Sequence, residues 1–335
     1  MDLKMLTELN AVVGREQEMR RTLLAELKEK GCDAYIDRMG NVITVKKGKS
    51  PNAKRVMVAA HMDEVGLIVS SCTEDGFLRV IPAGAIDPRV IISKRVLVGD
   101  EKLPGVIGAM AIHLQSAADR SRVLGFSDVY VDIGAKDKKE AEAKAPMGTY
   151  IAFDTEYVEF GEGLISAKAL DDRVGVYNLL RLLDDESEND LVAVFTSKEE
   201  AGCVGAKGAA FAVEPDVGIV LEGTSSNDLG ETPEVLHCCV VGGGVAVSFM
   251  DRSTIGNRKL FKLTLEAAKE ANVHHQVKHY IAGMNDAGEI ERARAGVPTI
   301  VLSVPCRYIH SPSSVCKLSD VDDQLALTKV LLNKC

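Results

Sequence analysis

Four short apolar runs in this chain each lead into a side chain that can bind a metal ion. The runs and the side chains that follow them are residues 56–60 with His61, 192–196 with Glu199 and Glu200, 218–221 with Glu222, and 298–304 with His310. In open α/β sheets, ligands bind just beyond the carboxyl ends of the strands. We therefore expect the four runs to be buried strands whose polar side chains converge on one edge of a sheet.

The pattern around these runs favours an α/β fold with a mixed or parallel central sheet covered by helices. Helical periodicity is expected over the first thirty residues, where Met19, Leu23 and Leu27 share one face. The other predicted helices are 172–183, 259–271 and 319–332, and the predicted strands are 42–45, 55–60, 191–196, 217–221 and 298–304.

Residues 70 to 160 have a different sequence pattern, in which short apolar runs are separated by Gly, Pro and Asp. Strands are predicted at 77–82, 95–99, 106–110, 129–134 and 149–153, and only the charged segment 136–144 is expected to be helical. The simplest organisation is one catalytic α/β domain built from residues 1–69 and 161–335, with residues 70–160 inserted as a small β-rich domain.

Composition excludes several classes of protein. Hydrophobic residues make up 46% of the chain, charged residues 27%, and the net charge is −9, which suits a globular protein and disfavours nucleic-acid binding. No run of about 18 apolar residues predicts a membrane helix. The N-terminus has no cationic segment before an apolar core, and the eight cysteines form no C-x-x-C pair, so we expect reduced thiols in a cytoplasmic protein. The adjacent Cys238 and Cys239 could bind a metal, but two buried small residues is the better interpretation.

The candidate ligands form a chemically coherent set. Asp171 and Asp172 add carboxylates at a point where a loop becomes a helix. Two imidazoles with several carboxylates suit Zn²⁺, Co²⁺ or Mn²⁺ rather than Ca²⁺ or an iron–sulfur cluster. A carboxylate can bridge two cations about 3.5–4 Å apart, as two-metal hydrolases require. Asp63, two residues beyond His61, could orient that imidazole through its other ring nitrogen.

Each residue also has a structural interpretation. Asp171 and Asp172 could simply cap a helix, since aspartate is a favoured N-cap. Glu199 and Glu200 could be a solvated pair, and His310 alone indicates little. A purely structural role explains Glu222 less well, because a carboxylate beside a buried strand needs a hydrogen-bond donor or a cation as its partner. The joint pattern is what favours a metal site over these separate explanations.

Four ordered motifs resemble those of the tetrahedral (TET) aminopeptidases, the glutamyl and deblocking aminopeptidases of the zinc-exopeptidase superfamily, some of which were labelled endoglucanases. The resemblance covers nearly the whole chain, including residues 105–114 and 128–135 of the inserted domain. The motifs are His-Met-Asp-Glu-Val-Gly at 61–66, Leu-Asp-Asp-Arg-Val-Gly at 170–175, Ser-Lys-Glu-Glu-Ala-Gly at 197–202 and Arg-Tyr-Ile-His-Ser-Pro at 307–312.

The resemblance implies a role for each matching position. Asp171 would be a carboxylate that bridges two divalent cations, His310 and Glu200 would complete one metal site, and His61 and Glu222 the other. Glu199 would be the general base and Asp63 would support His61. The bond between the two aspartates is often cis in this superfamily. Glu222 stands where many relatives carry Asp, and residues 283–288 replace a more usual Gly-Gly-Thr-Asp-Ala, with Asp286 retained.

The function predicted on this basis is removal of N-terminal residues from short peptides. Asp286 and Arg307 are candidate substrate contacts, and Arg307 could equally be structural. The resemblance also implies a homododecamer assembled through the inserted domain, although the domain would equally suit a lid or a dimer.

Two other enzymatic functions are compatible with the sequence. One is a metal-dependent deacylase of N-acyl amino acids, which would use the same ligands. The other is activity on cellulose, which needs two carboxylates that do not bind metal. A non-catalytic carrier would not need Glu199.

Overall fold

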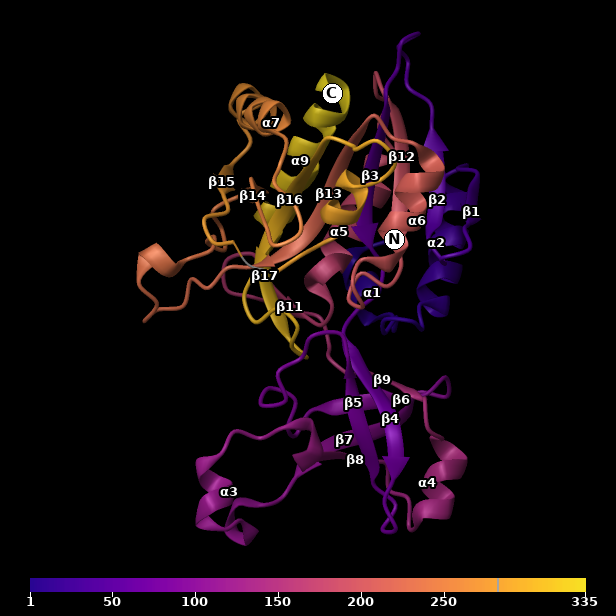
Figure 1. Ribbon diagram of the computed structural model, residues 1–335, viewed down its shortest axis with the longest axis vertical. Coiled ribbons are helices and arrows are strands. Elements are labelled where there is room, and N and C mark those ends of the chain that lie inside the picture. Colours follow the sequence, from indigo (N-terminus) through magenta and orange to yellow (C-terminus); the bar gives the residue numbers. More distant parts are fainter. Residues whose placement is uncertain (282) are drawn as a thin grey trace.

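The computed structural model of the protein describes residues 1–281 and 283–335. Figure 1 shows two parts joined end to end: a layered α/β part that contains both ends of the chain, and a smaller barrel at the far end of the long axis. In the part of the chain that the structure describes, no helix is long and apolar enough to cross a membrane.

An eight-stranded mixed sheet forms the centre of the α/β part. In spatial order its strands are β1 (Ala34–Ile36), β2 (Val42–Lys46), β12 (Asp190–Thr196), β3 (Arg55–His61), β13 (Val217–Ser225), β16 (Thr299–Cys306), β14 (Val245–Ser248) and β15 (His275–Val277). The middle four, β12, β3, β13 and β16, are mutually parallel. Their carboxyl ends therefore lie on one edge of the sheet, as the sequence predicted, and the mixed α/β fold class is confirmed.

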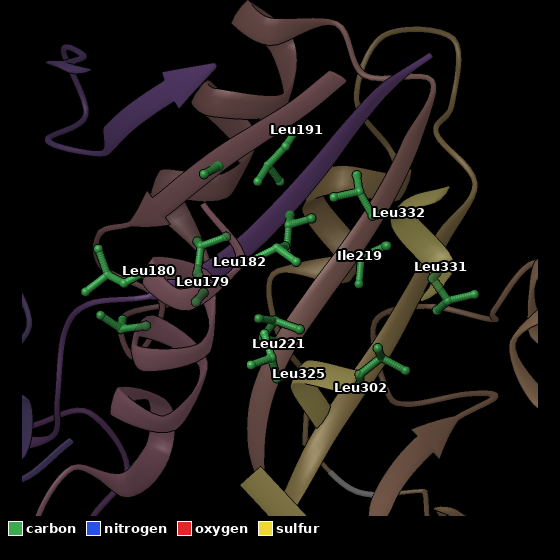
Figure 2. Packing of buried hydrophobic residues seen from close by; sticks show 14 of the residues in the cluster. Leu179, Leu180, Leu182, Leu191, Ile219, Leu221, Leu302, Leu325, Leu331 and Leu332 are labelled. Atoms are coloured by element: carbon green, nitrogen blue, oxygen red, sulfur yellow. The ribbon is translucent and has the colours of Figure 1, made fainter. Parts of the chain in front are cut away.

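Helices cover both faces of this sheet. On one face pack α1 (Leu3–Glu8), α2 (Gln17–Glu29), α5 (Leu170–Leu182), α7 (Arg258–Glu270) and α9 (Leu318–Lys334), and on the other α6 (Val204–Val213) and α8 (Ala287–Glu291). Figure 2 shows the first interface, where Leu179 and Leu182 of α5 and Leu325 of α9 meet Leu221 of β13 and Leu302 of β16. Leucines pack on this face, and alanine, valine and isoleucine pack on the other, so the strands and the loops after their carboxyl ends are held from both sides.

The first thirty residues do not form the continuous helix that their periodicity predicted. The chain leaves α1 after Glu8 and is extended before α2 begins at Gln17. Glu64 explains the break: its carboxylate accepts a hydrogen bond from the Ala11 backbone N–H (2.7 Å), and its backbone carbonyl accepts one from Val13 (3.0 Å). A tertiary contact thus overrides the helical pattern between two short helices.

Six strands close the smaller part into a barrel. They are β4 (Gly66–Cys72), β5 (Leu78–Ala83), β8 (Val129–Asp132), β7 (Leu103–Ala109), β6 (Arg95–Val98) and β9 (Tyr150–Phe153). The first and last of these pair with each other, Leu67 opposite Ile151 and Ile68 opposite Tyr150. The chain therefore enters and leaves the barrel at adjacent points, and the barrel has its own apolar core.

The barrel contains more helix than predicted. The expected helix is present as α4 (Lys138–Lys144), but α3 (Ala117–Ser121) and the 3₁₀ turns η1 (Ile112–Leu114) and η2 (Phe126–Asp128) were not predicted. α3 begins with a capping box, in which Ser116 and Asp119 bond each other's backbone N–H groups. A five-residue helix shows too little periodicity to be recognised from apolar spacing alone.

A third, three-stranded sheet holds the loop that contains His310. It consists of β10 (Val158–Phe160), β11 (Leu164–Ala167) and β17 (Ser314–Lys317). Arg307 and Val315 exchange two backbone hydrogen bonds of 2.8 and 3.0 Å, which close the base of the loop. Tyr308 and His310 both have a positive φ, 58° and 57°, so the loop turns sharply on either side of Ile309.

Candidate metal centre and active site

Side chains from the four parallel strands meet at their common carboxyl edge. His61 is the last residue of β3, Glu222 lies on β13, Glu200 follows β12, and His310 follows β16. His61 Nε2 lies 3.7 Å from Glu222 Oε2, and His310 Nε2 lies 3.4 Å from Glu200 Oε1. The structure thus brings together four of the five predicted metal ligands as two imidazole–carboxylate pairs.

Asp171, the fifth predicted ligand, joins the two pairs. Its Oδ1 lies 3.3 Å from His61 Nε2, and its Oδ2 lies 3.3 Å from His310 Nε2. Burial alone would raise the pKa of this carboxyl, but hydrogen bonds from His310 and His61 hold it well below its usual value. Asp171 is therefore ionised, with one oxygen directed to each imidazole.

The start of α5 explains how Asp171 reaches this position. Asp171 and Asp172 depart from helical φ and ψ, and the peptide bond between them is cis. Asp172 is fully buried and accepts hydrogen bonds from the backbone N–H groups of His61 (3.2 Å) and Gly175 (3.0 Å). One aspartate thus caps the helix and fixes the end of β3, which leaves the other free to face the histidines.

The two glutamates are buried acids with little neutralising charge. Burial raises the pKa of Glu200 to about 7, and it raises the pKa of Glu222 well above its usual range despite the nearby His61. Glu222 Oε1 is buried and has no hydrogen-bond partner among the residues that the structure describes. A buried carboxylate oxygen without a donor is costly, and a cation would satisfy it. This donor set of two imidazoles and three carboxylates fits divalent metal ions that accept nitrogen and oxygen ligands.

Glu199 lies beside these residues without a histidine partner. Burial, with the negative charges of Asp286 and Glu200, raises its pKa well above the usual range. Its Oε1 accepts a hydrogen bond from the Cys203 thiol at 3.3 Å. Asp286, 1% exposed, lies behind Glu199 and accepts a hydrogen bond of 2.5 Å from Thr196. Asp286 therefore belongs to the buried acidic cluster, and its predicted substrate contact stays a prediction.

Asp63 ties the two halves of the centre together. It is fully buried, and its two carboxylate oxygens accept hydrogen bonds of 3.1 Å from the backbone N–H groups of Glu199 and Glu200. The nearest contact of His61 Nδ1 is with the Asp63 backbone carbonyl at 3.2 Å, while the side-chain oxygen is 3.7 Å away. Asp63 thus fixes His61 mainly through its main chain and the two glutamates through its side chain.

Arg307 is held by a partner that the sequence did not reveal. Its Nε and Nη2 each donate a 2.8 Å hydrogen bond to Asp228, one to each oxygen. Asp228 lies in a loop of small polar residues after β13, with no periodicity or flanking motif to indicate its partner.

A second cluster that the sequence did not predict consists of Glu64, Lys168 and Arg173. All three are buried, and Lys168 Nζ lies 2.6 Å from a carboxylate oxygen of Glu64.

The architecture and the edge of the sheet define a class of enzyme. A mixed α/β sheet with imidazoles and carboxylates at its carboxyl edge, joined to a small barrel, is the organisation of zinc-exopeptidase-type aminopeptidases. The chain belongs to the M42 glutamyl aminopeptidase family, whose family model matches residues 40–327. Enzymes of this family are metal-dependent, and the chain is an aminopeptidase of the metallo-exopeptidase type.

Similar proteins cover the whole chain. It is 34% identical to a lysyl aminopeptidase of Pyrococcus furiosus over 99% of its own length and 96% of the relative's. Among solved structures, an aminopeptidase of the archaeon Desulfurococcus kamchatkensis superposes with a TM-score of 0.94 at 32% identity, covering 99% of this chain and 94% of the other. The TET1 peptidase of Pyrococcus horikoshii, which can assemble into a tetrahedron or a large octahedral shell, gives 0.86 at 30% identity, covering 99% and 98%.

Proposed function

We propose that the protein is a dinuclear metal-dependent aminopeptidase that removes N-terminal residues from short peptides. His310 and Glu200 would hold one divalent cation, His61 and Glu222 the other, and Asp171 would bridge them. The observation that carries this assignment is the position of Asp171, with one carboxylate oxygen 3.3 Å from each imidazole. No single-metal arrangement needs both oxygens of one aspartate to face different histidines.

The charge of the site supports two cations rather than one. Glu199, Glu200, Glu222 and Asp171 share a small buried volume, and their mutual repulsion contributes to the raised pKa values of the three glutamates. Bound cations would offset that repulsion, and one of them would coordinate Glu222 Oε1, which has no hydrogen-bond donor among the described residues. The mixed nitrogen and oxygen ligands suit Zn²⁺, Co²⁺ or Mn²⁺.

When bound, the two cations would acidify a water molecule, polarise the scissile carbonyl and anchor the free α-amino group of the peptide. In the proposed reaction, Glu199 takes a proton from the attacking water and then gives it to the leaving amine. Glu199 is not one of the proposed metal ligands, so its carboxylate is available for this exchange. Asp63 positions Glu199 by accepting a hydrogen bond from its backbone N–H.

We further propose that residues 1–69 and 161–335 form the catalytic domain, and that residues 70–160 form an oligomerisation domain that builds a homododecamer. The assembly of the Pyrococcus horikoshii relative into closed shells supports this. So do the exposed apolar side chains of the barrel segment around α3, where Ile112, Leu114 and Val123 are 69–70% exposed. Large apolar side chains left in solvent mark surfaces that bind another protein.

A metal-reconstitution experiment tests the catalytic proposal. The enzyme is stripped with EDTA, reloaded with Zn²⁺, Co²⁺ or Mn²⁺, and assayed on a panel of chromogenic aminoacyl substrates and their N-acetylated counterparts. We expect inactivation by EDTA, recovery with at least one metal at about two ions per chain, and no cleavage of the blocked substrates. Preference for the blocked substrates would instead identify a deacylase, and activity that survives complete metal removal would refute the proposal.

A further inference from the structure

A hollow of about 520 Å³ opens beside the candidate metal centre, between the carboxyl ends of β13 and β16. Ser225 lines it from β13, three residues beyond Glu222, which places the two about 10 Å apart along the strand. Ile309 lines it from the other side and directly precedes His310. We name it the β13–β16 hollow. A peptide whose first residue sits at the metal centre would meet this hollow with its first side chain.

The walls of the β13–β16 hollow are largely apolar. Leu229, Leu236, Tyr280 and Tyr308 line it and are 41%, 49%, 56% and 55% exposed. These side chains come from separate segments of the chain, yet all face one opening. Apolar lining with few polar groups is typical of sites that bury a small apolar ligand group.

Arg307 is the one lining residue with a permanent charge, among the described residues that form the β13–β16 hollow. Asp228 cancels that charge, because the guanidinium donates to both carboxylate oxygens in a forked pair. Asp228 also accepts hydrogen bonds from the Ser226 hydroxyl (2.8 Å) and the Val241 backbone N–H (3.0 Å). The carboxylate is thereby fixed in place, so an incoming substrate acid would have to compete with it for Arg307.

The thiol of Cys238 adds no net charge to the hollow. Its Sγ donates a hydrogen bond to the Tyr280 backbone carbonyl at 3.7 Å, and the Cys239 Sγ donates one to the Ser225 backbone carbonyl at 3.5 Å. A thiol that donates to a carbonyl is neutral, so the charge balance of the hollow depends on Arg307 and Asp228.

We propose that the β13–β16 hollow receives the first side chain of the substrate and selects uncharged, apolar residues, because Asp228 neutralises Arg307. Asp228 is then a specificity-determining residue that does not touch the reacting atoms. The proposal rests on the aminopeptidase function proposed above. It names the substrate class for this chain: peptides that begin with a residue such as leucine, rather than with glutamate or lysine.

Three variants test the charge balance by removing the charge of Asp228, the charge of Arg307, or both. Asp228→Asn leaves Arg307 unpaired, so cleavage of a glutamyl substrate should rise relative to a leucyl one by about tenfold, the value of a charge-assisted hydrogen bond. Arg307→Met leaves Asp228 unpaired, so the lysyl substrate should gain instead. The double variant carries neither charge, and its ranking should return to that of the wild type. The readout is kcat/KM for leucyl-, glutamyl- and lysyl-p-nitroanilide with the metal-loaded, full-length enzyme.

Asp87→Asn is the matched control. Asp87 lines a neighbouring hollow with Lys94 and His310, and it also forms a forked pair with an arginine: Arg89 Nε donates to its Oδ1 at 2.9 Å, and Arg89 Nη2 donates to its Oδ2. The same substitution there should leave all three substrate ratios unchanged. An equal gain in glutamyl cleavage in this control would show a general electrostatic effect and would overturn the assignment to Asp228.

The outcomes separate this inference from the proposed function. If the metal-loaded wild type cleaves all three substrates but prefers glutamate or lysine, or if folded Asp228→Asn keeps the wild-type ratios, the selectivity proposal is wrong and the aminopeptidase proposal stands. If the wild type cleaves none of the three, both fail. Should Asp228→Asn not fold, the wild-type ranking and the lysyl gain in Arg307→Met decide the question.

Discussion

Glu199 is the residue on which the proposed chemistry most depends, and its surroundings make it easy to isolate. In the described part of the chain, it shares no hydrogen bond with either histidine, and the one donor to its side chain is the Cys203 thiol. Replacement of its carboxylate by an amide would therefore leave the metal ligands in place while removing the proton acceptor.

We expect Glu199→Gln to lower kcat by about 10²–10⁴, the usual contribution of a general base, with little change in KM. Metal content, measured by inductively coupled plasma mass spectrometry, should stay at the wild-type level. Glu156→Gln, whose side chain is 80% exposed, is the control and should be fully active. Near-normal turnover by metal-loaded Glu199→Gln would remove Glu199 from the mechanism.

Asp228 gives a prediction of pH dependence. Burial alone would raise its pKa, but hydrogen bonds from Arg307, Ser226 and Val241 lower it to about 2. A folded-state pKa below the unfolded value of about 3.9 means that the ionised form stabilises the fold. This contribution is complete above about pH 4 and is lost as the pH falls toward 2.

Asp228→Asn should therefore be less stable than the wild type at neutral pH, by about 1 kcal/mol once solvent screening is allowed for. The gap should narrow between about pH 4 and pH 2. Urea denaturation of the metal-free proteins at neutral pH and near pH 3 measures it. A difference that is constant across that range would mean that the pairing with Arg307 does not stabilise the fold.

At the scale of whole elements, Glu64 joins three parts of the chain. It follows β3, its carboxylate binds the extended segment after α1, and it pairs with Lys168 and with Arg173 of α5. Burial lowers the pKa of both Lys168 and Arg173. Neither cation is accessible to water that could replace the missing carboxylate.

Glu64→Ala should cost about 3–5 kcal/mol of stability, because it leaves two buried cations without their partner. A shift in the urea midpoint of the metal-free protein measures this. The matched control is Glu74→Ala, which removes an exposed ion pair with Lys138 and should leave the midpoint unchanged. Equal midpoints for the two variants would contradict a structural role for the buried cluster.

Strands with ligands at their ends could be predicted because one physical rule governs them. A strand buried on both faces is a continuous apolar run, so a charged or imidazole side chain that ends the run is conspicuous, as with His61 at the end of β3 and Glu222 within β13. The break between α1 and α2 could not be predicted, because it depends on Glu64, more than fifty residues away in sequence. The pairing of Asp228 with Arg307 spans 79 positions and has no local pattern either.

At the scale of the whole molecule, the exposed apolar side chains near α3 are the clearest sign of assembly. Ile112, Leu114 and Val123 are 69–70% exposed and flank α3, which lies at the barrel end of the molecule in Figure 1. A dodecamer would bury such a surface, whereas a monomer would leave it in water at a cost to solubility.

Light scattering coupled to size exclusion should give a mass of about twelve chains for the wild type, the size that the proposed shell requires. The triple variant Ile112→Ser, Leu114→Ser, Val123→Ser should give a smaller species of unchanged circular dichroism. A control with three serines at Ile36, Val45 and Phe211, exposed apolar residues of the proposed catalytic domain, should keep the wild-type mass. A monomeric wild type would exclude the shell.

The pairing of β4 with β9 has a consequence for how such a molecule could arise. Because the strands that lead into and out of the barrel are neighbours, the two ends of the inserted segment need span only the width of one strand pair. A single genetic insertion in one loop of an ancestral enzyme could therefore have added the whole barrel without changing the order of strands in the older sheet. Later changes in the barrel could then have altered how copies of the chain associate while the catalytic chemistry stayed as it was.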